Sequence, residues 1–262
     1  MDDSGQMLGP NYHVPALEKG LDILECLAAR GVPLTQAQVA RALGRRPTEL
    51  FRMLTALERR GYIQRDPLSG AYRLTMRLYE LGHAHSPYQG LLRAAERPMR
   101  GLTEEVRQSC HLSVIHHGQL FVLAEEQSPT RISLSVEVGS SIALLNAASG
   151  RLLLAYLDPS RREKTLAQDT DFPRLPVDEQ AVLLDHLALI RSRGYETARS
   201  ETIEGISDLA VLVGTEESRI QAALTIAALV RDHEAFLAEA LPALRRSAES
   251  IACSTGLLVA GL

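Results

Sequence analysis

The stretch PTELFRMLTALERRGYI, residues 47–63, decides the fold of the first third of this chain. Pro47 suits the first turn of a helix, and Gly61 suits the position just past its end. Three leucines between them recur at helical spacing, which predicts an apolar stripe facing a core. The stripe consists of Leu50, Leu54 and Leu57. The outer side of the helix would carry Thr48, Glu49, Arg52, Thr55 and Arg59.

Two shorter helices precede this one. Residues 16–29 place four leucines at intervals of four, three and three, which predicts one buried helical face. These are Leu17, Leu21, Leu24 and Leu27. Thr35 can cap a second helix over 35–44, with the Gln38 side chain reaching back to it. After the third helix, YIQRD and AYRL indicate two short strands joined by the turn PLSG. Three helices followed by a hairpin predict a winged helix-turn-helix whose third helix reads DNA.

Charge is unevenly distributed along the chain. The formal net charge is −4, yet His13 to Glu80 holds 11 Lys+Arg against 7 Asp+Glu, a net of +4. A basic segment in an acidic protein indicates an anionic partner, and double-stranded DNA fits a reader helix. We therefore predict a DNA-binding surface formed by Thr35, Gln36, Arg45, Arg46, Thr48, Glu49, Arg52, Thr55, Arg59 and Arg73. Two other interpretations remain open: an ordinary solvated helix face, or a winged helix that binds an acidic protein.

Composition argues against several classes of protein. No run of eighteen apolar residues occurs, and residues 1–12 are acidic and polar, which predicts a disordered N-terminus and a cytoplasmic protein without a membrane partner. Cys26, Cys110 and Cys253 are far apart, so they predict buried thiols rather than disulfides or a zinc site. Trp is absent and aromatic residues are 4%, which argues against a surface that stacks several bases.

The rest of the chain alternates strands and helices. HLSVIHHGQLFVLAEE predicts a hairpin that turns at His117-Gly118, and ISLSVEV, residues 132–138, predicts a further strand. Helices are expected over NAASGRLLLAYL, SRREKTLAQ and DEQAVLLDHLALIRSRG. Strands at 195–200, 208–215 and 222–230 and a last helix from His233 are expected to follow. This mixture predicts an α+β domain with an antiparallel sheet and flanking helices.

The sequence contains no motif typical of an enzyme. It lacks a GxSxG elbow, an HExxH helix, a GxxxxGK loop and a GxGxxG turn after a strand. The close histidine pairs, His83 with His85 and His116 with His117, have no third metal ligand beside them. We therefore expect no catalytic residues, no metal and no cofactor. An enzyme that turns over its ligand in the C-terminal domain is the minor alternative.

A resemblance to a known family covers almost the whole chain. Residues 17–82 run from LEKGLDILECL through an RxLxxLexxGY core beginning at Arg52 to the ending YRLTMRLYELG. They resemble the N-terminal domain of the IclR family of bacterial transcription regulators. The later stretches SIALLNAASGRLLLAYL, RSRGYETARSETIEGISDLAVLV and AALTIAALV are similar to the effector domain of that family. The resemblance implies a winged helix-turn-helix at 13–75, a linker helix at 76–92 and a GAF-like effector domain at 93–262.

The resemblance also implies a pocket for a small-molecule effector. By position its residues are Leu144, Ala148, Ser149, Gly150, Asp208 and Thr225. Small residues at a helix start leave N–H groups that favour a carboxylate, so we expect a small organic or aromatic acid. Asp208 would accept a hydroxyl or amine of the effector, or else face water at a strand end. Asn146, Arg151 and the Pro47-Thr48 start of the third helix depart from the family pattern, so neither ligand nor operator carries over.

Together these features predict a ligand-responsive transcription regulator, expected to act as a repressor of a catabolic operon. Two winged helices in a homodimer or tetramer would read a pseudo-palindromic operator. Effector binding to the C-terminal domain would then change how the two readers are arranged.

Overall fold

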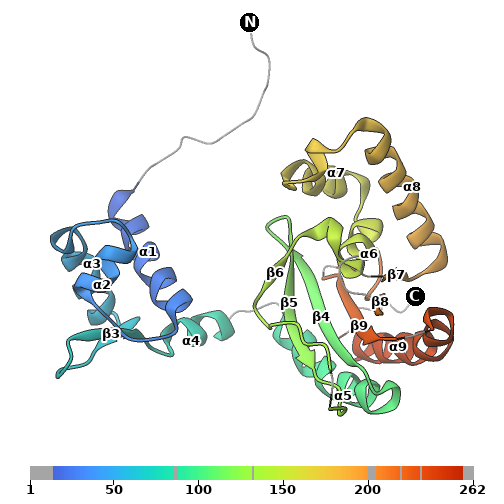
Figure 1. The fold of residues 1–262 in the computed structure, drawn as a ribbon, viewed down its shortest axis with the longest axis horizontal. Helices are drawn as coiled ribbons and strands as arrows, with labels where there is room; N and C mark the ends of the chain where they lie inside the picture. The colour runs from blue at the N-terminus through green and yellow to red at the C-terminus, as the bar shows by residue number, and fades with distance from the viewer. Residues whose placement is uncertain are drawn as a thin grey trace, which may run out of the picture. The chain divides into compact units, whose positions relative to one another are not determined.

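Of the 262 residues, the computed structural model describes 14–84, 88–131, 133–199, 205–218, 220–230 and 232–255. The chain forms two compact units, Met1–Ser86 and Pro87–Leu262 (Figure 1). The segment 1–12, predicted to be disordered, lies outside the described residues. Among the described helices, none is both long and apolar enough to cross a membrane.

The smaller unit is a winged helix-turn-helix, as predicted. Its elements are α1 (Pro15–Arg30), β1 (Leu34–Thr35), α2 (Gln36–Ala42), α3 (Pro47–Arg59), β2 (Ile63–Arg65), β3 (Ala71–Leu74) and α4 (Arg77–Ala84). The strands form an antiparallel sheet in the order β1-β3-β2. The sequence does not predict β1, because two residues are too few to show the alternation that marks a strand.

The core of this unit lies between its helices and its small sheet. It is formed by Ile23, Leu27, Val39, Ala40, Leu50, Leu54, Ile63 and Tyr72. The predicted stripe of α3 is confirmed at Leu50 and Leu54, while Leu57 is half-buried. The predicted buried face of α1 is wrong at its start, where the exposed fractions of Leu17 and Leu21 are 60% and 48%. These two leucines border an open groove instead of the core.

The predicted cap of α2 is confirmed. The backbone N–H of Gln38 donates to Thr35 Oγ1 at 3.4 Å, and the backbone N–H of Thr35 donates to Gln38 Oε1 at 2.8 Å. This reciprocal pair satisfies two N–H groups that the helix itself cannot, which stabilises a short helix by about 1 kcal/mol. The cap therefore fixes where α2 begins and, through it, the position of α3.

The larger unit is an α+β domain, as predicted. Its elements are α5 (Gln89–Val106), β4 (Ser109–His116), β5 (Gln119–Glu126), β6 (Ser141–Ile142), η1 (Leu144–Asn146), α6 (Ala148–Tyr156), α7 (Pro159–Gln168), η2 (Phe172–Arg174), α8 (Val177–Arg193), β7 (Glu196–Arg199), β8 (Ile206–Val213), β9 (Ala222–Leu229) and α9 (His233–Thr255). The strands form one antiparallel sheet in the order β6-β5-β4-β9-β8-β7. β4 thus pairs with β9, the last strand of the sheet in the sequence.

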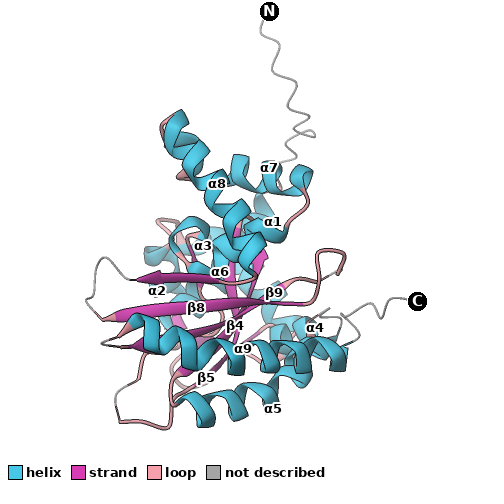
Figure 2. Ribbon diagram, turned by 90° about the vertical axis from the view of Figure 1, so that its right-hand side faces the viewer, coloured by secondary structure: helices cyan, strands magenta, loops and turns pink. Residues whose placement is uncertain are grey.

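Helices cover both faces of this sheet (Figures 1 and 2). α5 and α9 pack on one face, over a core that includes Leu112, Val114, Leu209, Leu224 and Ile226. α6 lies on the other face, with α7 and α8 beyond it. The core on that side includes Leu120, Leu144, Ala148, Leu152, Ala210 and Ala223. Because α6 is enclosed between the sheet and α8, nearly all of its residues are buried.

One predicted strand is wrong. The described residues 133–137 form no strand. The Glu125 carboxylate takes hydrogen bonds that a neighbouring strand would otherwise take, from the backbone N–H of Val136 at 2.7 Å and from Ser135 Oγ at 3.0 Å. Pairing with β5 falls on Ser141–Ile142 instead. The predicted hairpin between β4 and β5 is confirmed.

The prediction of buried thiols holds for only one of the three cysteines. Cys110 is buried, and burial raises the pKa of its thiol to about 12. Cys26 is half-buried. Cys253 is exposed, because it lies on the side of α9 that is turned away from the core residues Ile251 and Ala252.

Candidate DNA-reading surface and effector site

The turn between α2 and α3 presents two arginines. Gly44 has a left-handed φ of 63°, which glycine adopts without strain, so the chain can reverse there. The Gln36 side chain donates to the carbonyl oxygen of Pro47 at 2.7 Å and ties α2 to the first turn of α3. Arg45 and Arg46 are exposed at this turn. They lie near the N-terminus of α3, where a phosphate also meets free helix N–H groups.

The outer face of α3 carries the predicted reading residues. Thr48, Arg52, Thr55 and Arg59 recur at intervals of four, three and four, so they share one face, and all four are exposed. Phe51 lies among them with 56% of its surface exposed. Sequence reasoning missed Phe51, although its spacing of three from Thr48 places it outside the leucine stripe. An exposed ring at this place suits contact with a thymine methyl group.

Ion pairs to α1 flank this face. The Glu49 carboxylate lies 3.6 Å from Lys19 Nζ, and the Arg45 guanidinium lies 3.1 Å from the Asp22 carboxylate. All four groups are partly exposed, so each pair contributes at most about 1 kcal/mol and can exchange for a contact with DNA. The α3-side guanidinium groups with no hydrogen bond or ion pair to any described residue are those of Arg46, Arg52 and Arg59.

The wing adds two further arginines. Asp66 shapes the turn by accepting hydrogen bonds from the backbone N–H and hydroxyl of Ser69, and these bonds hold the pKa of Asp66 below its ordinary value of 3.8. The Arg65 guanidinium lies over the Tyr72 ring, 5.7 Å from its centroid. Arg73 is exposed on β3. The wing therefore holds its cations on a hairpin whose turn is internally hydrogen-bonded.

The ten predicted DNA-binding residues all lie in the smaller unit, but two of them have other tasks. The side chain of Thr35 is engaged in the cap of α2. The side chain of Gln36 bonds to α3 and is half-buried. Both therefore position the reading surface from inside the protein.

The predicted effector residues come from η1, α6, β8 and β9. η1 and α6 approach closely, and a Cβ at Gly150 would lie 1.9 Å from the carbonyl oxygen of Leu144, so only glycine fits there. Ala148 and Ser149 occupy the first turn of α6 and are buried. No side chain caps α6, so the N–H groups of its first turn have no side-chain partner. Such an end favours a bound anion.

Polar side chains line the sheet below this helix end. Ala210 and Ala223 pack toward α6 from β8 and β9. Residues two positions away share that face, so Asp208 and Thr225 also face the α6 side. Asp208 is the third residue of β8, inside the strand and partly buried. The expected alternative, a strand-end residue facing water, is therefore not what is found.

β4 extends this polar face. His111 pairs in register with Thr225, and Ser113 pairs with Ala223. The side chains of Ser113 and Thr225 are 0% and 1% exposed, and their hydroxyl oxygens have no hydrogen-bond partner among the described residues. A buried hydroxyl without a partner costs about 1–3 kcal/mol, which a polar ligand group would recover. Two unpartnered hydroxyls close to an uncapped helix are the feature that most clearly indicates a ligand site.

Burial sets the protonation of this face. It lowers the pKa of His111 to about 4, so the imidazole is neutral at pH 7. Burial also raises the pKa of Asp208 to about 6, against the opposing effect of the Arg151 guanidinium. Arg151 is itself held by the Glu196 carboxylate at 2.9 Å and by the carbonyl oxygen of Leu145 at 2.8 Å. Arg151 thus joins η1, α6 and β7 around the site.

Sequence reasoning missed His111 and Ser113. The signal was present, because the polar residues of HLSV alternate with Leu112 and Val114 in a strand. Within the described part of the chain, no cluster of three or more His, Cys, Asp or Glu side chains is placed to hold a metal ion.

Known proteins show the same two-part organisation. The family model for the IclR helix-turn-helix domain matches residues 16–67, and that for the bacterial transcriptional regulator IclR C-terminal domain matches 86–253. The transcriptional regulator XynR of Escherichia coli K12 is 25% identical over 82% of this chain and 86% of its own length. The glycerol operon regulatory protein of Streptomyces coelicolor is 28% identical over 76% of this chain and 78% of its own.

A solved structure has the same fold. The IclR homologue of Microbacterium hydrocarbonoxydans in complex with 4-hydroxybenzoate superposes with a TM-score of 0.76, covering 92% of this chain and 99% of that one. Its sequence is 23% identical, so the likeness is one of fold.

Proposed function

The chain belongs to the IclR family of bacterial transcriptional regulators, and on that premise we propose that it is a repressor of a catabolic operon that releases DNA on binding a small organic acid. It is a DNA-binding regulator rather than an enzyme by family. The observation that carries the ligand-responsive part is the pair of buried, unpartnered hydroxyls of Ser113 and Thr225 beside the uncapped start of α6.

For DNA reading, α3 enters the major groove with Thr48, Phe51, Arg52 and Thr55 toward the base edges. Phosphate contacts come from the turn and the wing, through Arg45, Arg46, Arg59 and Arg73. The support is their shared exposure on one side of the unit and the absence of competing partners for three of the guanidinium groups among the described residues. Phosphate contacts supply most of the affinity, and α3 supplies most of the discrimination.

The readers work in pairs. A groove of about 380 Å³ lies between α1, α3 and α4 of the smaller unit. Its rim includes Leu17, Leu21, Leu78 and Leu81, whose exposed fractions are all 40% or more. Apolar side chains so exposed favour contact with a second copy, and a two-fold pair of readers matches a pseudo-palindromic operator. The segment 76–92, which contains α4, is the proposed linker between residues 13–75 and 93–262.

The effector lies between the start of α6 and the polar face of the sheet. Its carboxylate meets the N–H groups of Ala148 and Ser149, and its other polar groups meet Thr225, Ser113 and Asp208. Leu144 and Gly150 shape the apolar and backbone walls. A small aromatic acid suits these groups, and the homologue bound to 4-hydroxybenzoate supports that class.

Repression requires that effector and operator prefer different states of the protein. A ligand that binds equally well with and without the operator shifts nothing. The segment from η1 to Arg151 is the first to meet the effector, and its tie to Glu196 connects it with β7 and α8. The effector thereby gains a route from its site to the rest of the unit.

The test is fluorescence anisotropy of the full-length protein on its own upstream DNA, with random DNA as competitor and salt as the variable. We expect specific binding that falls steeply with salt and is released by one of a panel of small carboxylic acids. Arg52→Ala should reduce the preference for specific over random DNA by about 1–3 kcal/mol. Equal losses on both DNAs would contradict a base-reading role for Arg52. Binding no tighter than to random DNA, across the panel, would favour a protein-interaction module.

A further inference from the structure

α8 carries apolar side chains on its outer side as well as on its buried side. Leu187 and Ile190 face the core. A second set recurs at intervals of four, three and four, the spacing of a helix–helix seam. This set, the α8 stripe, consists of the exposed residues Val177, Ala181, Leu184 and Ala188. Val177 is 82% exposed and Leu184 43%, so no other described part of the chain covers the stripe.

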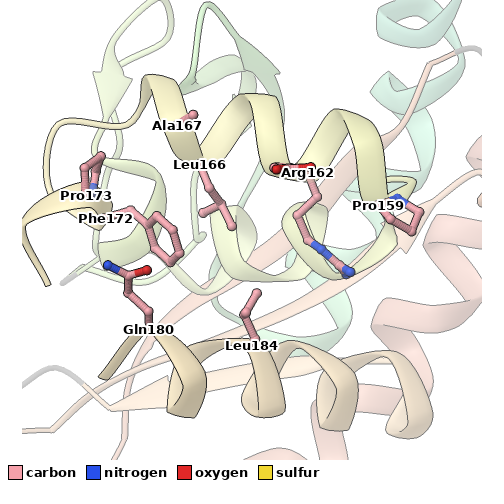
Figure 3. Close-up of a pocket in the computed structure, with 9 residues that line it drawn as sticks. Pro159, Arg162, Leu166, Ala167, Phe172, Pro173, Gln180 and Leu184 are labelled. Atoms are coloured by element: carbon pink, nitrogen blue, oxygen red, sulfur yellow. The ribbon is translucent and has the colours of Figure 1, made fainter. Parts of the chain in front are cut away.

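The α8 stripe borders an apolar groove (Figure 3). The groove has a volume of about 590 Å³ and lies between α7, η2 and α8. Leu166 lines it from α7, Phe172 from η2 and Leu184 from α8. Because Leu184 belongs to both the groove and the stripe, the two form one continuous apolar surface. This surface is separate from the polar face that contains Asp208 and Thr225.

The charges of α8 are ordered along its length. Asp178 and Glu179 lie in the first turn, and Arg191 and Arg193 lie in the last. Asp178 and Arg191 are about 20 Å apart along one helix, at 1.5 Å per residue, so they cannot meet within a single copy. In an antiparallel pair of such helices, the acidic turn of each lies beside the basic turn of the other, and the helix dipoles also oppose.

We propose that the α8 stripe and its groove form a two-fold contact between two copies of this chain. In an antiparallel pair centred at Leu184, that side chain of each copy lies between Ala181 and Ala188 of the other, where small residues let the helices approach. Asp178 then lies beside Arg191 of the second copy. A two-fold contact uses the same patch on both copies, so it needs a self-complementary surface, and this charge order supplies one.

The size of the contact determines its role. With 17 residues, α8 is about 25 Å long, and a strip about 10 Å wide along it buries a few hundred Å² per copy. A stable independent interface buries about 800 Å² per partner. The contact therefore joins copies that another surface already holds together, because tethering raises the effective concentration. Together with a pair of readers it makes a tetramer from two dimers.

The first test is the mass of the full-length protein by analytical ultracentrifugation. Leu184→Glu should halve the mass of the assembly, from tetramer to dimer, or from dimer to monomer if the readers do not pair. Val182→Glu is the matched control, because Val182 is 69% exposed on the opposite flank of α8 and should leave the mass unchanged. Circular dichroism melts should be alike for both variants. An unchanged mass for Leu184→Glu overturns the proposal.

A charge swap tests the direction of the pairing. Asp178→Arg and Arg191→Asp should each weaken self-association about tenfold or more, and the double variant should restore it. Arg191 also pairs with Glu216 in its own copy, so Glu216→Ala is the control for losing that pair alone. Restoration in the double variant cannot come from misfolding, because each single change would persist. A double variant as weak as the singles overturns the antiparallel contact.

Discussion

Replacement of Asp208 by Asn should stabilise the protein at neutral and alkaline pH. Burial raises the pKa of Asp208 from its ordinary value of 3.8 to about 6, although Arg151 acts in the opposite direction. As pH rises from about 4 to 6, the unfolded chain releases a proton that the folded chain keeps. The free energy of unfolding therefore falls over that window, and the full cost is present above about pH 6.

The expected magnitude follows from the two pKa values of Asp208. Each tenfold change in a protonation equilibrium corresponds to about 1.4 kcal/mol, so a carboxylate held ionised at pH 8 costs about 3 kcal/mol. Asn has the same shape and no charge, so the variant avoids this cost. We expect its free energy of unfolding to exceed that of the wild type by about 2–3 kcal/mol at pH 8. The difference should vanish near pH 4.

Urea unfolding followed by far-ultraviolet circular dichroism at pH 4, 6 and 8 measures this difference. Asp185→Asn is the matched control, since Asp185 is exposed on α8 and its replacement should change little at any pH. A variant of Asp208 that is less stable than the wild type at pH 8, or a gain that is equal at all three pH values, would refute the reasoning. Effector binding should weaken in the same variant if the carboxylate accepts a hydrogen bond from the ligand.

Three further outcomes are expected. Gly150→Ala should lower the free energy of unfolding by about 1–3 kcal/mol in urea titrations, because its Cβ would lie 1.9 Å from the Leu144 carbonyl oxygen. Thr35→Ala should cost about 1 kcal/mol by the same measurement, with the salt dependence of DNA binding unchanged. Arg46→Ala should weaken binding to specific and random DNA alike and reduce the slope of log K against log salt by about 0.9, measured by anisotropy.

Helical periodicity predicts the smaller unit well, because each of its helices turns one stripe to a single small core. The errors fall on apolar side chains that have no core to face. Leu17 and Leu21 repeat with the same spacing as Leu24 and Leu27, so periodicity alone cannot separate them. In the larger unit the misplaced strand has the same origin: alternation at 133–137 says nothing of the Glu125 carboxylate that occupies its hydrogen-bonding groups.

The effector residues come from the family resemblance rather than from any local pattern, and nothing yet tests them individually. His111 and Ser113 show why local patterns stop short. Alternation assigns them to one face of a strand, but only the pairing of β4 with β9 brings that face beside Thr225 and under α6. Contacts between segments so far apart in the sequence leave no mark on composition or spacing.

The order of the strands also matters while the chain is being synthesised. β4 emerges early in the larger unit, yet its central neighbour β9 is made only after α6, α7 and α8. At about 5–20 residues per second, one edge of β4 waits on the order of ten seconds for its partner. The unit Met1–Ser86 is complete before that wait begins. Each newly made molecule thus has its reader before its sensor, and the unpaired edge is where a chaperone has most to protect.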